Sequence, residues 1–272
     1  MNNKIYCSSG VMIGRVNGYN YKIFTEAAKE IEADGFELMM VHAYYSNLAR
    51  ICAEIEKKDI NIEVVHAEKD IGGLLPQGDP LLARKALTDF EINCRVASFL
   101  GAKKLVFHLW SAPDSDRLFE KNLGFLPELL SIAGRHSVEL LIENVPCSAK
   151  DPFTHLSRIE ELYPSVRFIY DTRFGAFHEQ TERFLSSPWL ENGRIAHMHF
   201  SDFIGPAHDF KALRPIPHLT FGVVGFDSIM PVISEKYHSS ITLESPEIHP
   251  DGTNVEKLNA DLNYIRKWVC KQ

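Results

Sequence analysis

The chain has 272 residues, a formal net charge of −7, and an ordinary globular composition in which 45% of residues are hydrophobic. This length allows one large domain or two small ones and is sufficient for a sizeable core. The acidic balance argues against a duplex-DNA partner, which normally requires a basic face on the protein.

The five cysteines are scattered, and no two of them form a C-x-x-C pair. We therefore expect no thiolate metal site and a reduced, cytoplasmic compartment. The N-terminal sequence MNNKIYCSSG lacks the apolar core of a signal peptide. No apolar run approaches the roughly 20 residues that span a membrane, so no membrane association is expected.

Short apolar runs alternate with amphipathic stretches along the whole chain. A first strand is predicted at Lys4–Cys7, followed by a helix over Tyr21–Ala33 that Asp34-Gly35 would stop. A second helix begins at Asp79-Pro80 and runs to about Leu100. A last helix is predicted over Gly252–Val269. The remaining strand-like runs are Phe36–Val41, Ile62–His66, Lys104–His108, Val138–Glu143, Val166–Asp171, Ile195–His199 and Ile241–Glu244.

Most of these runs are rich in Val, Ile, Leu or Phe with little alternation, which is typical of parallel strands buried on both faces. Eight such strands alternating with helices predict a parallel α/β sheet. Because the length is close to the roughly 250 residues of a (β/α)₈ (TIM) barrel, we predict one such barrel domain over residues 1–272. A doubly wound open sheet is the alternative. The lack of G-x-G-x-x-G after the first strand weakens its dinucleotide-binding form.

Six successive predicted strands end on an acid or an imidazole: His66, His108, Glu143, Asp171, His199 and Glu244. Barrel strands point their carboxyl ends at one mouth, where these side chains should converge. Three carboxylates in a small cavity need a counter-charge, and a divalent cation is the simplest. We therefore predict that Glu143, Asp171, His199 and Glu244 bind one Mn²⁺, Mg²⁺ or Co²⁺ ion, with Zn²⁺ also acceptable. Coincidence, with each residue serving only its own packing or loop, is the weaker interpretation.

Several short segments, in their order and spacing, resemble the xylose-isomerase-like barrel superfamily. They are ENVP after strand five, YDT after strand six, HMHFSD after strand seven, TLES at strand eight, and the glycine-bearing stretch HLTFGVVGFDSI. This superfamily includes sugar and sugar-phosphate isomerases and epimerases, inosose dehydratases and apurinic endonucleases of the endonuclease IV type. The resemblance implies that Glu143, Asp171, His199 and Glu244 match the metal ligands of the isomerase and epimerase branch.

Departures from the family pattern limit what the resemblance implies. Many relatives carry a His three residues after the strand-six Asp, where this chain has Phe174. Many carry a Glu near the end of strand two, where GFELMM places Met40. The endonuclease branch has an Asp-x-His pair at the positions of Ile216 and His218. A three-zinc nuclease site would lack ligands here, although two strand-end histidines match that branch.

Further residues are predicted to bind substrate rather than metal. His66 and His108 should line the mouth beside the ion. The indole of Trp110 could cover the apolar face of a sugar or simply pack under a lid. Arg173 could bind a substrate phosphate or carboxylate or be an ordinary surface charge. His218 is the last substrate-binding candidate.

Three features near strand seven lie outside the predicted metal ligands. His197 should point to the same side as His199 but one layer deeper, so we assign it a supporting or core role. Asp202 could orient the site or be an ordinary turn acid. The loop from Phe200 to about Gly225 is long enough to act as a lid.

The predicted function is a metal-dependent isomerase or epimerase of a sugar, sugar derivative or sugar phosphate. Its reaction would pass through an enediolate with Glu143 and Glu244 as the acid/base pair. The alternatives are an inosose-type polyol dehydratase or lyase, an endonuclease IV-like phosphodiesterase, and a non-catalytic sugar-binding barrel. A small sugar or polyol is the expected partner, nucleic acid is not expected, and the sequence is compatible with a homo-oligomer.

Overall fold

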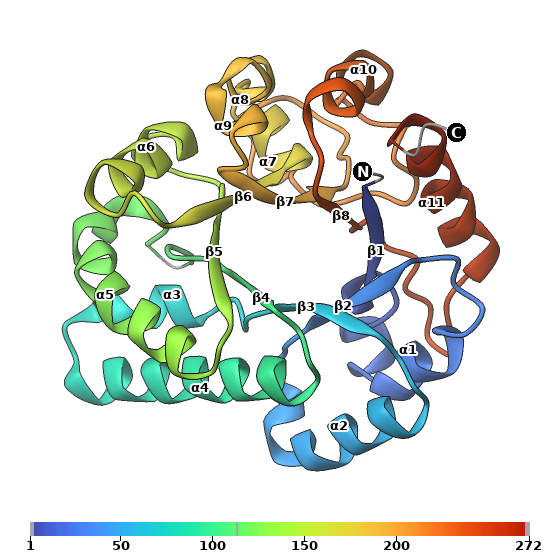
Figure 1. Ribbon diagram of the computed structural model, residues 1–272, viewed down its shortest axis with the longest axis horizontal. Coiled ribbons are helices and arrows are strands. Elements are labelled where there is room, and N and C mark those ends of the chain that lie inside the picture. Colours follow the sequence, from blue (N-terminus) through green and yellow to red (C-terminus); the bar gives the residue numbers. More distant parts are fainter. Residues whose placement is uncertain (1–2, 113, 270–272) are drawn as a thin grey trace.

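Eight parallel strands form a closed barrel in chain order, with the last strand paired to the first. The computed structural model describes residues 3–112 and 114–269. Helices surround the ring of strands (Figure 1). The predicted (β/α)₈ barrel is therefore confirmed, and the open-sheet alternative is wrong. The strands are β1 (Lys4–Ser8), β2 (Gly35–Met39), β3 (Ile62–His66), β4 (Lys104–Phe107), β5 (Glu139–Glu143), β6 (Arg167–Asp171), β7 (Ile195–Phe200) and β8 (Ser240–Leu243).

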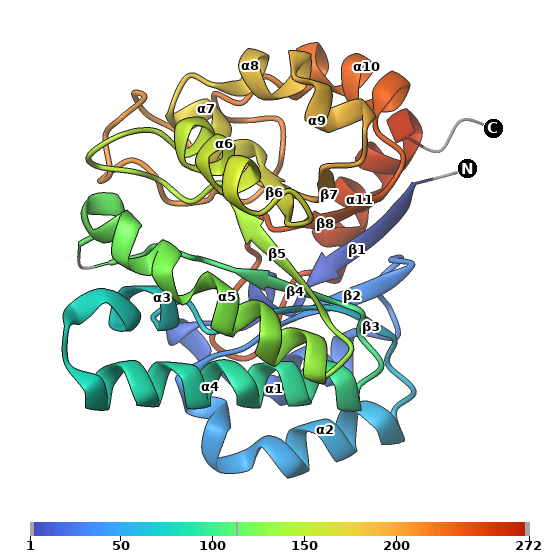
Figure 2. The same cartoon turned by 60° about the vertical axis from the view of Figure 1, so that its left-hand side comes forward.

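The helices vary in length, and α4 and α5 are the longest. Figure 2 shows the strands running between α1, α2 and α4 on one side and α8 and α10 on the other. Within the described residues, no helix combines the length and apolarity needed to cross a membrane. The α-helices are α1 (Tyr21–Ala27), α2 (Leu48–Lys57), α3 (Ile71–Leu74), α4 (Pro80–Phe99), α5 (Phe119–Arg135), α6 (Pro152–Leu162), α7 (Thr172–Phe177), α8 (Thr181–Ser186), α9 (Pro188–Glu191), α10 (Phe226–Lys236) and α11 (Val255–Val269).

The helix expected over Tyr21–Ala33 is wrong in its second half. The N–H of Glu30 bonds to the carbonyl of Ala27, which replaces helical hydrogen bonding with a tighter turn. Asp34 exchanges two hydrogen bonds with the backbone of Ile5 in β1. Because these bonds hold Asp34 at the barrel, the chain has to leave the helix early.

Strand periodicity places the polar side chains above an apolar layer. The buried layer inside the barrel consists of Tyr6, Val64, Val106, Leu141, Ile169 and Ala196. Successive residues of a strand face opposite sides, so residues two positions apart share a side. Two positions beyond Val64, Val106, Leu141 and Ile169 stand His66, His108, Glu143 and Asp171. The apolar layer thus forms the floor of the barrel mouth.

Two glycines bring the segment after β3 close to the segment after β4. A Cβ atom at Gly72 would collide with the carbonyl oxygen of His108, and one at Gly73 would collide with that of Ala112. The side chain of Asn122 on α5 donates a 2.6 Å hydrogen bond to the Gly72 carbonyl. A larger residue at Gly72 would push the His108 backbone away from its position at the mouth, and one at Gly73 would displace Ala112 in the same segment.

Candidate metal centre at the barrel mouth

Four side chains meet at the carboxyl ends of β5 to β8. Glu143 and Asp171 are the last residues of β5 and β6, His199 is near the end of β7, and Glu244 follows β8. One potential ligand atom from each lies within 4.8 Å of those from the other three. The structure therefore brings together the four residues that the sequence predicts as metal ligands.

The imidazole of His199 faces two of the carboxylates. Its Nδ1 lies 2.9 Å from Glu143 Oε1 and 3.6 Å from Glu244 Oε2. His199 and Glu143 are buried, whereas the side chain of Glu244 is 12% exposed. Glu244 thus forms the solvent-facing side of the centre.

The two carboxylate oxygens of Asp171 have different roles. Oδ1 accepts a 3.0 Å hydrogen bond from the N–H of Phe174 and caps the start of α7. Within the described residues Oδ2 has no hydrogen-bond partner, although Arg173 Nη2 lies 3.6 Å away. Burial raises the pKa of Asp171 to about 7, with Arg173 opposing the rise and Glu143 and Glu244 adding to it. Negative charge at this position therefore lacks sufficient compensation from the protein.

Glu143 contacts three histidines. Its Oε1 faces His199, while its Oε2 lies 2.6 Å from His108 Nε2 and 3.5 Å from His66 Nε2. Burial alone would raise the pKa of Glu143, but His108 and His199 outweigh burial and hold this pKa well below its usual range. His66 and His108 thus lie beside the four predicted ligands, in the position expected for substrate-binding residues.

An unpaired carboxylate oxygen at the mouth fits a bound cation. Within the described residues, Asp171 Oδ2 is buried and lacks a hydrogen bond, whereas Glu143 Oε2 and His108 Nε2 lie 2.6 Å apart and face each other. Leaving a buried polar atom unpaired costs about 1–3 kcal/mol, and more for a charged group. Three carboxylates and one imidazole nitrogen are a suitable donor set for Mn²⁺, Mg²⁺ or Co²⁺. The residues present therefore fit a divalent metal ion.

Sequence reasoning missed one carboxylate at this site. Met40, which occupies the position of the family's strand-two glutamate, is buried in the core. Glu37 of β2 faces the barrel interior instead. Glu37 Oε2 lies 3.1 Å from Nε2 of His199. The apolar neighbours Phe36 and Leu38 could have identified it, because they assign Glu37 to the opposite face of the strand.

The predicted sugar contact of Trp110 is wrong. Its side chain is fully buried, and its indole N–H donates a 3.0 Å hydrogen bond to the carbonyl of Val145. The ring packs against Phe119 and His155, with centroid distances of 5.7 and 5.3 Å. Trp110 is therefore a packing residue, which was the alternative interpretation.

Arg173 and His218 lie in different places. Arg173 is buried beside Asp171, and its guanidinium donates to Ser201 Oγ and to the carbonyl of Leu213. The surface-charge interpretation of Arg173 is therefore wrong, and its role toward substrate stays a prediction. His218 packs on Phe221, with ring centroids 5.0 Å apart. It also lies near Asp261, where burial raises the pKa of the carboxyl group and His218 opposes that rise. Because Asp261 belongs to α11 on the outside of the ring, the structure does not bring His218 into the centre.

Asp202 holds the two ends of the long loop after β7 together. Its carboxylate accepts hydrogen bonds from the N–H groups of Phe203, Gly222 and Val224 at 2.8 to 3.0 Å. Asp202 therefore stabilises the loop and is not part of the centre. Phe210 lies in the loop between these two ends. It is 52% exposed and reaches the mouth of the barrel.

A second acid–histidine cluster is structural. Asp116, Cys147 and His155 lie close together. The carboxylate of Asp116 is already saturated, because it accepts hydrogen bonds from His155 Nε2 and from the N–H groups of Ser148, Ala149 and Lys150. It fixes the loop after β5 and leaves no oxygen for a metal ion.

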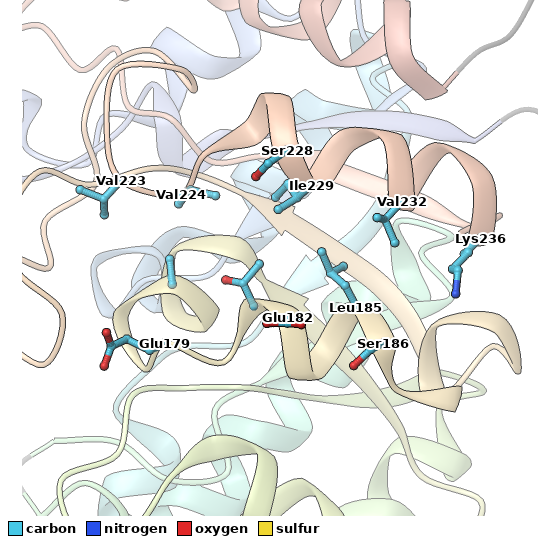
Figure 3. Close-up of a pocket in the computed structure, with 12 residues that line it drawn as sticks. Glu179, Glu182, Leu185, Ser186, Val223, Val224, Ser228, Ile229, Val232 and Lys236 are labelled. Carbon is cyan, nitrogen blue, oxygen red and sulfur yellow. The ribbon is translucent and has the colours of Figure 1, made fainter.

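Two cavities differ in their relation to the centre. A cleft of about 560 Å³ opens beside it and is lined in part by Lys69, His108, Phe174 and Phe210, a size suited to a small molecule. A groove of about 610 Å³ lies between α8 and α10, where Leu185 faces Ile229 (Figure 3). None of the four predicted ligands lines either cavity, but His108 lines the cleft and lies 2.6 Å from Glu143, so the cleft is the cavity that reaches the centre.

Comparisons with known proteins agree with this architecture. The family model described as "xylose isomerase-like TIM barrel" matches residues 25–268. No curated protein matches the chain. Among solved structures, D-allulose 3-epimerase from Methylomonas sp. is 15% identical with a TM-score of 0.70, covering 98% of this chain and 97% of that one.

Two further structures show the same fold. The 3-keto-D-glucoside 4-epimerase of E. coli is 15% identical with a TM-score of 0.70, covering 97% of this chain and 99% of that one. A xylose isomerase domain protein from Alicyclobacillus acidocaldarius is 12% identical with a TM-score of 0.71, covering 98% of each chain. At these identities the likeness establishes the fold.

Proposed function

The chain belongs to the xylose isomerase-like TIM barrel family, and from this premise we propose that it is a metal-dependent isomerase or epimerase of a sugar, sugar derivative or sugar phosphate. The observation that carries the proposal is the cluster of Glu143, Asp171, His199 and Glu244, with ligand atoms within 4.8 Å of one another. The fold shared with epimerases of D-allulose and of 3-keto-D-glucoside supports a sugar as the substrate.

In this proposal Asp171 and His199 act mainly as metal ligands. A bound divalent ion supplies Lewis acidity, which makes the C–H between a carbonyl and a neighbouring hydroxyl of a ketose more acidic. Glu143 and Glu244 approach from β5 and β8, three strands apart around the ring, and so reach the substrate from different sides. One glutamate removes the C–H proton to give an enediolate, and the other returns a proton. Return to the neighbouring carbon is isomerisation, and return to the opposite face is epimerisation.

His108 connects the centre with the cleft. It contacts Glu143 and also lines the cavity that a substrate would enter. Burial lowers the pKa of His108 to about 4, against the opposing effect of Glu143. The ring is therefore neutral near pH 7, and because its Nε2–H faces the carboxylate of Glu143, Nδ1 is left to accept a hydrogen bond from a sugar hydroxyl.

A screen of ketoses and their phosphates in D₂O with added Mn²⁺, Mg²⁺ or Co²⁺ tests the proposal. NMR of the recovered sugars should show deuterium at the carbon next to the carbonyl, together with a new isomer or epimer. Formation of a dehydrated product would assign the protein to the polyol dehydratases instead. Sugar binding with no exchange and no product would show a binding barrel and refute the enzymatic proposal.

The loop after β7 is expected to close over a bound substrate. Phe210 and Leu213 line the cleft from this loop, while Asp202 anchors its ends. Lids of this kind commonly exclude water from the reaction. Hydrogen exchange followed by mass spectrometry should show slower exchange across residues 204–221 in the presence of a saturating substrate. Unchanged exchange in this segment, with slower exchange elsewhere at the mouth, would contradict a lid.

A further inference from the structure

A buried glutamate stands directly behind the predicted histidine ligand. Oε2 of Glu37 lies 3.1 Å from Nε2 of His199, on the side of the ring away from Glu143 and Glu244. The hydroxyl of Thr242 donates a 3.2 Å hydrogen bond to the same oxygen. Glu37, Thr242 and His199 have no exposed surface.

The hydrogen bonds continue toward the opposite end of the barrel. Nε2 of His197 lies 2.8 Å from the hydroxyl of Thr242, and Nδ1 of His197 lies 2.7 Å from the hydroxyl of Ser240. Lys104 donates a 2.8 Å hydrogen bond to Ser240. The expected deeper position of His197 is therefore correct, and both of its nitrogens are occupied by hydroxyl groups. His197 thus has no free nitrogen with which to bind a metal ion.

These residues form a column that runs from Lys104 through Ser240, His197 and Thr242 to Glu37. Its two end groups determine the direction of every hydrogen bond. The Lys104 ammonium can only donate, whereas the Glu37 carboxylate can only accept. Because Thr242 donates its single proton to Glu37, it accepts from Nε2–H of His197. Nδ1 of His197 then accepts from Ser240, which in turn accepts from Lys104. By the same rule, Nε2 of His199 is the donor to Glu37.

We propose that Glu37 is a positioning residue that fixes His199 as the Nε2–H tautomer and directs Nδ1 toward the metal ion. This inference rests on the proposed metal centre but assigns a function to a residue outside the four ligands. A carboxylate behind an imidazole ligand orients the ring and increases its basicity. Thr242 and His197 hold the carboxylate in place from below. The metal ion therefore depends on an acid that does not contact it.

The Glu37→Gln variant tests the proposal, because glutamine keeps the shape of the side chain and removes its charge. Titration with Mn²⁺, with free ion measured by EPR, should give affinity about 10–100-fold weaker than in the wild type, as for other partners of metal ligands. The Co²⁺-saturated variant should also show a changed visible absorption spectrum. Glu63→Gln on neighbouring β3 is the matched control, because it removes a charge outside the column and should leave Mn²⁺ affinity unchanged.

Thr242→Val is a second variant that keeps shape and removes the bond supporting Glu37. It should weaken Mn²⁺ binding in the same direction at an unchanged circular dichroism spectrum. Wild-type affinity and an unchanged Co²⁺ spectrum in folded Glu37→Gln would overturn the inference while the metal centre stands. If Glu37→Gln does not fold, wild-type affinity in Thr242→Val overturns it. A wild-type protein that binds no Mn²⁺ would overturn both the metal centre and this inference.

Discussion

Replacing either Glu143 or Glu244 by glutamine is expected to slow turnover by about 10²–10⁴-fold, the contribution of a positioned acid or base. Glutamine has nearly the same shape but cannot take up a proton. Both side chains also belong to the four-residue cluster, yet Asp171 and His199 remain in each variant. Some metal and substrate binding should therefore survive while proton transfer is lost.

Measurements of kcat and of substrate C–H exchange in D₂O test the expected loss of proton transfer. Turnover should fall in both variants, whereas exchange should fall as strongly as turnover in the variant that lacks the glutamate removing the substrate proton. Glu247→Gln is a suitable control, because Glu247 lies in the loop after β8 but pairs with His249 and Lys257 instead of the centre. Wild-type turnover in either Glu143→Gln or Glu244→Gln, or wild-type exchange in both, would mean that the two-glutamate mechanism is wrong.

Removal of divalent metal is expected to abolish turnover, and addition of Mn²⁺, Mg²⁺ or Co²⁺ should restore it. The physical reason is the excess of negative charge at the mouth, shown by the unpaired Oδ2 of Asp171 and its raised pKa. Because an ion that binds only the folded chain stabilises it, chelation should also lower Tm. Activity and Tm that are both unchanged after chelation and dialysis would argue against a metal centre.

Two variants locate the ion within the cluster. Asp171→Asn retains an oxygen that can accept from the N–H of Phe174, so α7 stays capped while the charge is lost. His199→Ala removes the imidazole ligand altogether. Both should show reduced metal content by elemental analysis. Wild-type metal content in both variants would place the ion elsewhere.

Most of the strands and the four clustered residues could be predicted because one physical pattern specifies both. A parallel strand buried on two faces is a short apolar run, and a polar residue at its carboxyl end is conspicuous after it. Glu143 after Leu140–Ile142 and Asp171 after Phe168–Tyr170 are examples. Closure of the ring then determines that these ends meet.

Residues within a strand or loop were harder to predict. Glu37 was missed because the strand continues with apolar residues after it, so no polar end marked the position. The burial of Trp110 and the outward position of His218 depend on how long loops pack against Val145 and α11. Such packing involves partners that are distant in sequence, and local patterns carry no information about them.

The pairing of β1 with β8 has a consequence for how the chain acquires its site. These strands come from opposite ends of the sequence, and Glu37 on β2 and Glu244 after β8 lie on either side of their seam. Contacts between distant segments form slowly, because a long stretch of chain has to be ordered first. A nascent chain that lacks β8 can present Glu143 and Asp171, but it cannot enclose an ion. Capture of the proposed metal ion would therefore belong to the last step of folding and would distinguish finished molecules from incomplete ones.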